Sequence, residues 1–185
     1  VVSHAKTLGY TPRSARAPVA YLQVTINNSN LTSISIDKGT KFTTQVDGTT
    51  YAFVVNATRS VTSVNGVLRF SNLEVYEGTL VTAKYTVDSN DIEKKFMLTD
   101  NRADTTTLKV SVQNSASDVT TKTYTLASDI SQVTATSNVY FIQENEDGRF
   151  EVYFGDDVVG KKPTDGNIVI LEYVVTNKEK ANGAS

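Results

Sequence analysis

Residues 19–27 read Val-Ala-Tyr-Leu-Gln-Val-Thr-Ile-Asn, and this stretch decides the fold class. Small or aliphatic residues alternate along it with polar or aromatic ones, which is the period of a β-strand with one covered face. The same period recurs through most of the chain. Threonine and valine are its most frequent residues, with 26 and 24 copies, and both favour a pleated sheet over a helix.

Turn signals divide the chain into short strands. Asp47-Gly48, Asn65-Gly66 and Asp147-Gly148 each lie between two alternating segments, which predicts three β-hairpins. Residues 128–132 predict a single helical turn with Ser128 or Asp129 as its N-cap. We therefore expect a mainly β fold of about a dozen short antiparallel strands in two small β subdomains, preceded by a short helical or extended N-terminal segment.

Three segments are expected along the chain. Residues 1–18 predict a helix end capped by Gly9 and then an extended linker, since Pro12 and Pro18 disfavour helix before them. Residues 19–100 predict a first β subdomain and residues 101–185 a second one, with residues 99–104 as the boundary. Residues 10–18 and 99–104 are candidate hinges. Two subdomains that share a sheet edge are expected, and the alternative is that the first strand, residues 19–27, pairs with the last, residues 168–175, in one continuous sheet. The chain reads as a fragment of a longer one.

Composition excludes several classes of function. A net charge of −2 argues against a general nucleic-acid surface, and no apolar run is long enough for a membrane span. The absence of cysteine excludes disulfides and thiolate sites. The single histidine, His4, makes a His-rich zinc site and a Ser–His–acid triad improbable. The composition therefore offers no visible active site.

The densest group of acidic residues lies between positions 144 and 165. It lacks the alternating acidic spacing of a calcium loop, so these residues are interpreted mainly as turn formers. A hydrolase would need a pair of carboxylates, for which Asp156 and Asp157 are the candidates to test. The acidic residues are Glu144, Glu146, Asp147, Glu151, Asp156, Asp157 and Asp165.

The stretch from Phe150 to Pro163 is the most unusual in the chain. An aromatic strand passes directly into Gly155-Asp156, and Gly160 permits a positive φ or a close backbone approach. With the residues that follow, this stretch resembles the signature of the baseplate J-like family. Its amino-acid sequence is most similar in kind to that of the wedge proteins of T4-like contractile-tailed phages. The residues that carry the resemblance are Phe154, Gly155, Asp156, Gly160, Pro163, Gly166 and Tyr173. Asp157 departs from the family, where glycine is common.

The resemblance implies a structural role in the tail baseplate of a virion assembled in the host cytoplasm. It implies a late structural protein that links wedges into a ring around the tail hub and rearranges when the sheath contracts. The implied partners are a second copy, as a homodimer within a wedge, and other baseplate wedge proteins. It implies no enzyme activity and no catalytic residues, metal, cofactor or small-molecule substrate. It also implies no nucleic-acid or membrane partner.

One alternative comes from a different class of function. A non-catalytic carbohydrate-binding β-sandwich of a secreted or surface protein would present a concave platform of aromatic side chains. The chain has no tryptophan, so tyrosines would have to form it. The candidates are Tyr76, Tyr85, Tyr124, Tyr140 and Tyr153.

Overall fold

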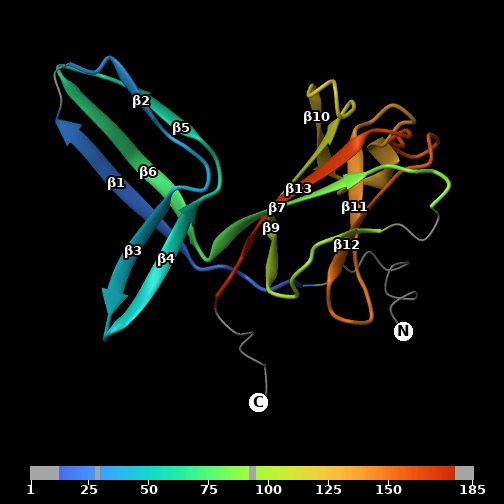
Figure 1. Ribbon diagram of the computed structural model, residues 1–185, viewed down its shortest axis with the longest axis horizontal. Coiled ribbons are helices and arrows are strands. Elements are labelled where there is room, and N and C mark those ends of the chain that lie inside the picture. The colour runs from blue at the N-terminus through green and yellow to red at the C-terminus, as the bar shows by residue number, and fades with distance from the viewer. Residues whose placement is uncertain (1–12, 28–29, 92–94, 178–185) are drawn as a thin grey trace.

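The computed structural model describes residues 13–27, 30–91 and 95–177. The fold there is mainly β, as predicted, and consists of one four-stranded, one seven-stranded and one two-stranded sheet (Figure 1). Residues 13–18 are extended, while the expected helix end at residues 3–8 and Gly9 lies outside the described residues. No helix in the described ranges has the length and apolar character that crossing a bilayer requires.

The four-stranded sheet has the order β1-β6-β4-β3, and every pair in it is antiparallel. Its strands are β1 (Val19–Asn27), β3 (Lys41–Val46), β4 (Thr49–Val55) and β6 (Val67–Glu77). A small sheet of β2 (Ser33–Ile36) and β5 (Arg59–Thr62) packs its apolar side chains against one face. The core between them contains Val55, Phe70, Leu73 and Val75.

The seven-stranded sheet has the order β7-β13-β9-β10-β11-β12-β8. Its strands are β7 (Thr79–Thr86), β8 (Phe96–Met97), β9 (Ala103–Gln113), β10 (Thr121–Leu126), β11 (Val139–Glu144), β12 (Phe150–Phe154) and β13 (Ile168–Val175). A 3-10 helix, η1 (Ile130–Gln132), begins after Asp129, whose side chain accepts a hydrogen bond from the Ser131 amide. The predicted single helical turn is thereby confirmed, with Asp129 as its N-cap.

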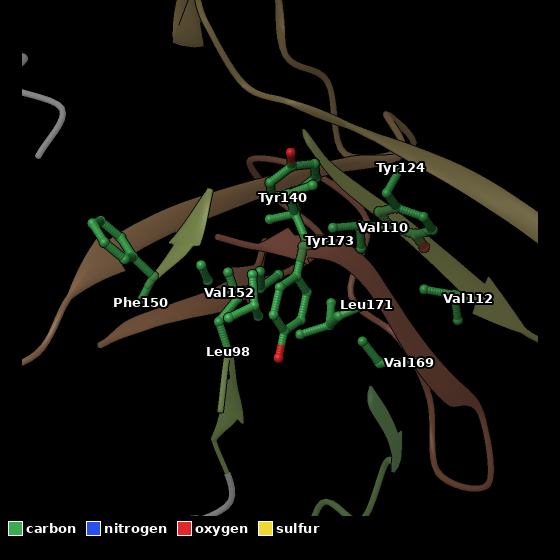
Figure 2. Close-up of a cluster of buried hydrophobic side chains, with 13 residues drawn as sticks. Leu98, Val110, Val112, Tyr124, Tyr140, Phe150, Val152, Val169, Leu171 and Tyr173 are labelled. Atoms are coloured by element: carbon green, nitrogen blue, oxygen red, sulfur yellow. The ribbon is translucent and has the colours of Figure 1, made fainter. Parts of the chain in front are cut away.

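The seven-stranded sheet curls until its two end strands meet. The Tyr85 hydroxyl on β7 donates a hydrogen bond of 2.6 Å to the Met97 carbonyl on β8, and the Tyr85 and Phe96 rings meet edge to face. The curled sheet encloses one core, to which β9, β12 and β13 contribute most of the buried side chains (Figure 2). Tyr173, Leu171 and Val169 of β13 are completely buried there.

Two expected hairpins have the geometry that the sequence predicts. Asp47 and Gly48 take φ values of 51° and 78° between β3 and β4, as a type I′ turn requires. Asn65 and Gly66 also form a type I′ turn, with φ values of 51° and 75° and two hydrogen bonds between Val64 and Val67. The strand pairing extends no further, because β5 pairs with β2. The third hairpin joins β11 to β12 through a longer turn, in which Gly148 has a positive φ of 73° but Asp147 does not.

Two other details of pairing differ from expectation. The alternative in which the first and last strands pair is wrong: β1 pairs with β6, and both edges of β13 are occupied by β7 and β9. β10 and β11 form a parallel pair, whereas antiparallel strands were expected. The connection between them contains η1 and returns the chain from the end of β10 to the beginning of β11, which a parallel pair requires.

The segments expected to be a linker and a boundary are fixed by hydrogen bonds. Ala17 is buried, and its amide donates 2.9 Å to the Asp104 carboxylate. Ser14 Oγ accepts from the Thr105 amide at 3.0 Å. Residues 99–102 join β8 to β9 within one sheet, and Ala103 and Asp104 already belong to β9. The division at residues 100/101 stays a prediction, while the sheets themselves change at Gly78.

Gly78 carries the chain from one large sheet to the other. It is the single residue between β6 and β7, and it has a φ of 133°. A Cβ placed on it would lie 2.2 Å from the Val175 carbonyl oxygen of β13. A hydrophobic cluster joins the two sheets at this crossing. It contains Val54 and Tyr76 of one sheet, Leu80 and Val174 of the other, and Ala17 of the segment before β1. The crossing therefore demands glycine both for its backbone angle and for space.

Replacement Gly78→Ala is expected to lower the free energy of unfolding by about 3 kcal/mol or more, because the new methyl group collides with backbone that cannot give way. Urea unfolding of purified chains measures this. Gly39→Ala is the matched control, since Gly39 also has a positive φ of 87° but open space around its Cβ position. It should cost only about 1 kcal/mol from the backbone angle. Equal losses for the two variants would contradict the tight crossing.

Candidate functional site

The residues that carry the family resemblance lie in one region. Phe154 is the last residue of β12, and residues 155–167 form the loop that leads to β13. Tyr173 lies on β13. We call residues 155–167 the motif loop. Its polar groups are largely satisfied within the fold, as the contacts below show.

Gly155 and Gly160 bring two parts of the motif loop into contact. A Cβ on Gly155 would lie 2.0 Å from the Val159 carbonyl oxygen and 2.3 Å from that of Gly160. Gly160 is buried, has a φ of 85°, and donates its amide to the Thr134 carbonyl at 3.0 Å. The close backbone approach that the sequence predicted for these glycines is therefore present in the structure.

The aspartates of the motif loop bind backbone amides. Asp156 Oδ1 accepts from the amides of Val158 and Val159, each at 3.0 Å, and these bonds hold the pKa of its carboxyl below the usual range. Asp157 takes a φ of 66° and accepts from the Lys162 amide at 2.9 Å. Both carboxylates are thus committed to turn geometry. The left-handed backbone at Asp157 explains why glycine suits this position.

Asp165 attaches the motif loop to the segment after β7. Its two carboxylate oxygens accept from the Ser89 amide at 2.6 Å and from the Ser89 hydroxyl at 2.7 Å. Those hydrogen bonds lower the pKa of Asp165. The neighbouring Gly166, with a φ of 82°, donates its amide to the Val87 carbonyl at 3.0 Å. These contacts hold the loop against the segment that follows β7.

Aromatic residues anchor the two ends of the motif region in the core. The Phe154 ring makes edge-to-face contacts with Phe96 and Tyr124, at centroid distances of 5.5 and 5.3 Å. Tyr173 is fully buried, and its hydroxyl accepts from the Thr99 amide at 3.0 Å. Pro163 is buried as well. These contacts give the motif residues roles in packing and turn formation.

A pocket of about 360 Å³ lies beside the motif loop. Its lining includes Lys95, Phe96, Glu151, Lys162 and Pro163. Glu151 is 7% exposed, and its Oε2 atom lacks a hydrogen bond but lies 3.6 Å from Lys95 Nζ. The described residues contain no group of three or more histidine or acidic side chains arranged to hold a metal ion. The remaining acidic candidates Glu144, Glu146 and Asp147 lie at the end of β11 and in the turn after it.

The tyrosines of the carbohydrate hypothesis do not form one platform. Tyr124 and Tyr140 are buried in the core of the curled sheet, and Tyr85 packs against that core. Tyr76 lies at the sheet crossing, with its hydroxyl donating 2.6 Å to Glu74. Tyr153 is 40% exposed and stacks on Phe141. A concave aromatic surface made from these five rings is therefore absent.

The sequence analysis missed two buried carboxylates at the sheet crossing. Glu77 is 3% exposed and accepts from Thr176 Oγ1 at 2.8 Å, and Asp104 is 1% exposed and accepts from the amides of Ala17 and Thr106. The signal available was Glu77-Gly78 inside a strand pattern, which indicates a close backbone approach. Nothing in the pattern at Asp104 distinguished it from a loop residue.

Replacement Tyr173→Phe is expected to lower the free energy of unfolding by about 1 kcal/mol, because the part-buried hydrogen bonds between Thr99 and the Tyr173 hydroxyl are lost. Thermal and urea unfolding both report it. Tyr153→Phe is the control at an exposed hydroxyl and should change stability by less than about 0.5 kcal/mol. An unchanged Tyr173→Phe variant would refute a structural role for this hydroxyl.

Acid is expected to release the motif loop from Ser89. Because the pKa of Asp165 is lowered in the folded chain, its stabilising contribution is complete above the ordinary carboxyl value of about 4 and is lost as the pH falls through the lowered pKa. The amide chemical shift of Ser89 should follow this titration. Asp165→Asn should abolish the dependence on pH. A Ser89 amide that does not titrate in the unsubstituted chain would count against the contact.

Comparison with known proteins identifies the source of the resemblance. The family profile described as "Bacteriophage baseplate wedge protein gp6, third domain" matches residues 80–181, more than half of the chain. These residues run from β7 through β13 and include all of the curled sheet except Thr79, the first residue of β7. The baseplate wedge protein gp6 of Enterobacteria phage T4 is 26% identical over 204 aligned residues, which cover the entire chain and 30% of that relative.

The chain thus spans about a third of the length of the curated relative that it matches. The predicted resemblance to T4-like wedge proteins is confirmed, and with it the assignment to the tail baseplate of the virion. The β-rich chain belongs to the bacteriophage baseplate wedge protein family, and its seven-stranded sheet corresponds to that family's third domain.

Proposed function

We propose that this chain is a structural segment of a contractile phage tail baseplate. It works by contact, as part of the wedge and inner ring that link neighbouring wedges around the hub. The observation that carries this proposal is the match of the wedge third domain to the curled sheet. The contacts of the motif residues agree with it, since Asp156, Asp157 and Asp165 hold turns together and leave no carboxylate pair free for chemistry.

The chain acts without catalysis and assembles with other baseplate wedge proteins and with a second copy of itself. A ring component must transmit position from one neighbour to the next, which requires stiff units joined by well-packed crossings. The crossing at Gly78 fits this requirement. Lys38 Nζ of the four-stranded side also binds both oxygens of Glu172 on β13, at 2.8 and 2.7 Å.

The rearrangement at sheath contraction moves this segment as one body. Both candidate hinges are engaged by contacts: residues 14–18 bind Asp104 and Thr105, and Tyr173 binds Thr99. The movement is then absorbed at interfaces with neighbouring proteins, where surfaces slide more readily than packed cores.

The test is co-expression of the full-length parent with the neighbouring tail proteins, followed by affinity purification and native mass measurement. We expect a defined hetero-oligomer that contains two copies of the parent. A parent that stays monomeric and binds none of the tail proteins would contradict the proposed function. A hetero-oligomer that contains only one copy of the parent would contradict the homodimer but remain consistent with the role in the wedge.

A further inference from the structure

A set of polar contacts joins the two large sheets at a distance from the crossing. Lys38 lies in the turn that leads into β3, and its Nζ atom donates to both carboxylate oxygens of Glu172 on β13, at 2.8 and 2.7 Å. Lys109 on β9 donates in the opposite direction, from the curled sheet to the Asn56 carbonyl just after β4. We call Lys38, Asn56, Lys109 and Glu172 the clasp.

The three charges of the clasp act on one another. Glu172 lies directly opposite Lys109 in the register of β13 and β9. Burial lowers the pKa of Lys109, the Glu172 carboxylate opposes that change, and the Lys38 ammonium group adds to it. The Glu172 side chain is 18% exposed, whereas that of Lys38 is 51% exposed. One carboxylate that is largely withdrawn from water therefore serves ammonium groups from both sides of the crossing.

Both ends of the pair between Lys38 and Glu172 are held in place by backbone contacts. The Lys38 amide donates to Thr58 Oγ1 at 3.1 Å, and the next amide, that of Gly39, donates to the Val55 carbonyl at 2.7 Å. The turn is thereby attached to the end of β4. Glu172 lies inside β13, which is paired along both edges. The ion pair therefore connects two fixed pieces of backbone, unlike a surface pair between mobile side chains.

The crossing itself leaves rotation about Gly78 weakly opposed. The apolar cluster there contains three buried residues in the described part of the chain, and small interfaces between structural units permit relative motion. Glu172 precedes Val175, the residue that Gly78 touches, by three positions along β13, which is roughly 10 Å. A bond at that distance from the pivot opposes rotation more effectively than contacts at the pivot.

We propose that the clasp is a conformational lock that sets the angle between the two large sheets. Gly78 fixes where the sheets meet, and the bond from Lys38 to Glu172 fixes how they are rotated about that point. The inference deepens the proposed function, because it names the contact that lets the segment move as one body, and it rests on that function only for its use in the baseplate. Its test needs the chain alone, so its failure would leave assembly with tail proteins untouched.

Two spin labels, one on each large sheet, measure the lock directly. The chain contains no cysteine, so Thr44→Cys on β3 and Lys122→Cys on β10 provide two exposed attachment sites. Double electron–electron resonance of the labelled chain should give a narrow distance distribution. Glu172→Gln should roughly double its width, because the sheets stay joined but their angle is no longer fixed. Asp147→Asn is the matched control, since it removes an ion pair with Arg149 inside one turn of the curled sheet and should leave the width unchanged.

A second substitution and added salt separate the lock from a general loss of structure. Lys38→Met should also broaden the distribution, and it should add nothing in a chain that already carries Glu172→Gln, because both changes remove the same bond. Raising NaCl from about 0.05 M to about 1 M should broaden the distribution of the labelled chain without either substitution, since Lys38 is half exposed. Circular dichroism checks that the strands persist. A width that neither salt nor substitution changes would overturn the inference, and so would effects of the two substitutions that add.

Discussion

The close approach of Gly78 to the Val175 carbonyl is the constraint on which the rest of the structure depends. The chain passes from β6 in the four-stranded sheet to β7 in the seven-stranded sheet through this single residue. A side chain there would lie 2.2 Å from the carbonyl oxygen of the last strand. The relative placement of the two sheets therefore follows from backbone packing, to which Val54, Val174 and Leu80 add apolar contacts. The buried carboxylates of Glu77 and Asp104 fix the flanking segments by binding their amides and hydroxyls.

This arrangement suits a protein that holds neighbours in position. The curled sheet closes on itself through Tyr85, Phe96 and Phe154, and the motif loop is fastened by its own aspartates. Its unusual sequence is explained by turns and close contacts, which need glycine at Gly155 and Gly160. The four-stranded sheet, by contrast, ends in β1, a strand whose apolar row is half open. The larger hydrophobic core therefore lies in the curled sheet.

Local features were predictable from the sequence, while partners distant in the chain were not. The alternation in residues 19–27 and the Asp47-Gly48 turn specify strands and a hairpin directly, because both depend on neighbouring residues. Sheet membership depends on packing between distant segments. The sequence near residues 19–27 does not show whether β6 or β13 is the pairing partner. The sequence around β5 is equally compatible with pairing to β6 and pairing to β2. The motif loop was recognisable because its glycines mark close approaches, but the role of Asp104 depends on Ala17, far away in the chain.

The most direct test of the central claim is cryo-electron microscopy of the phage baseplate that contains the full-length parent, before and after sheath contraction. The account predicts that this segment lies in the wedge ring in both states. It also predicts that its two sheets superpose as one body, with Gly78 against Val175 in each. Density for this segment outside the baseplate, or a change in the relative orientation of the two sheets upon contraction, would contradict the account.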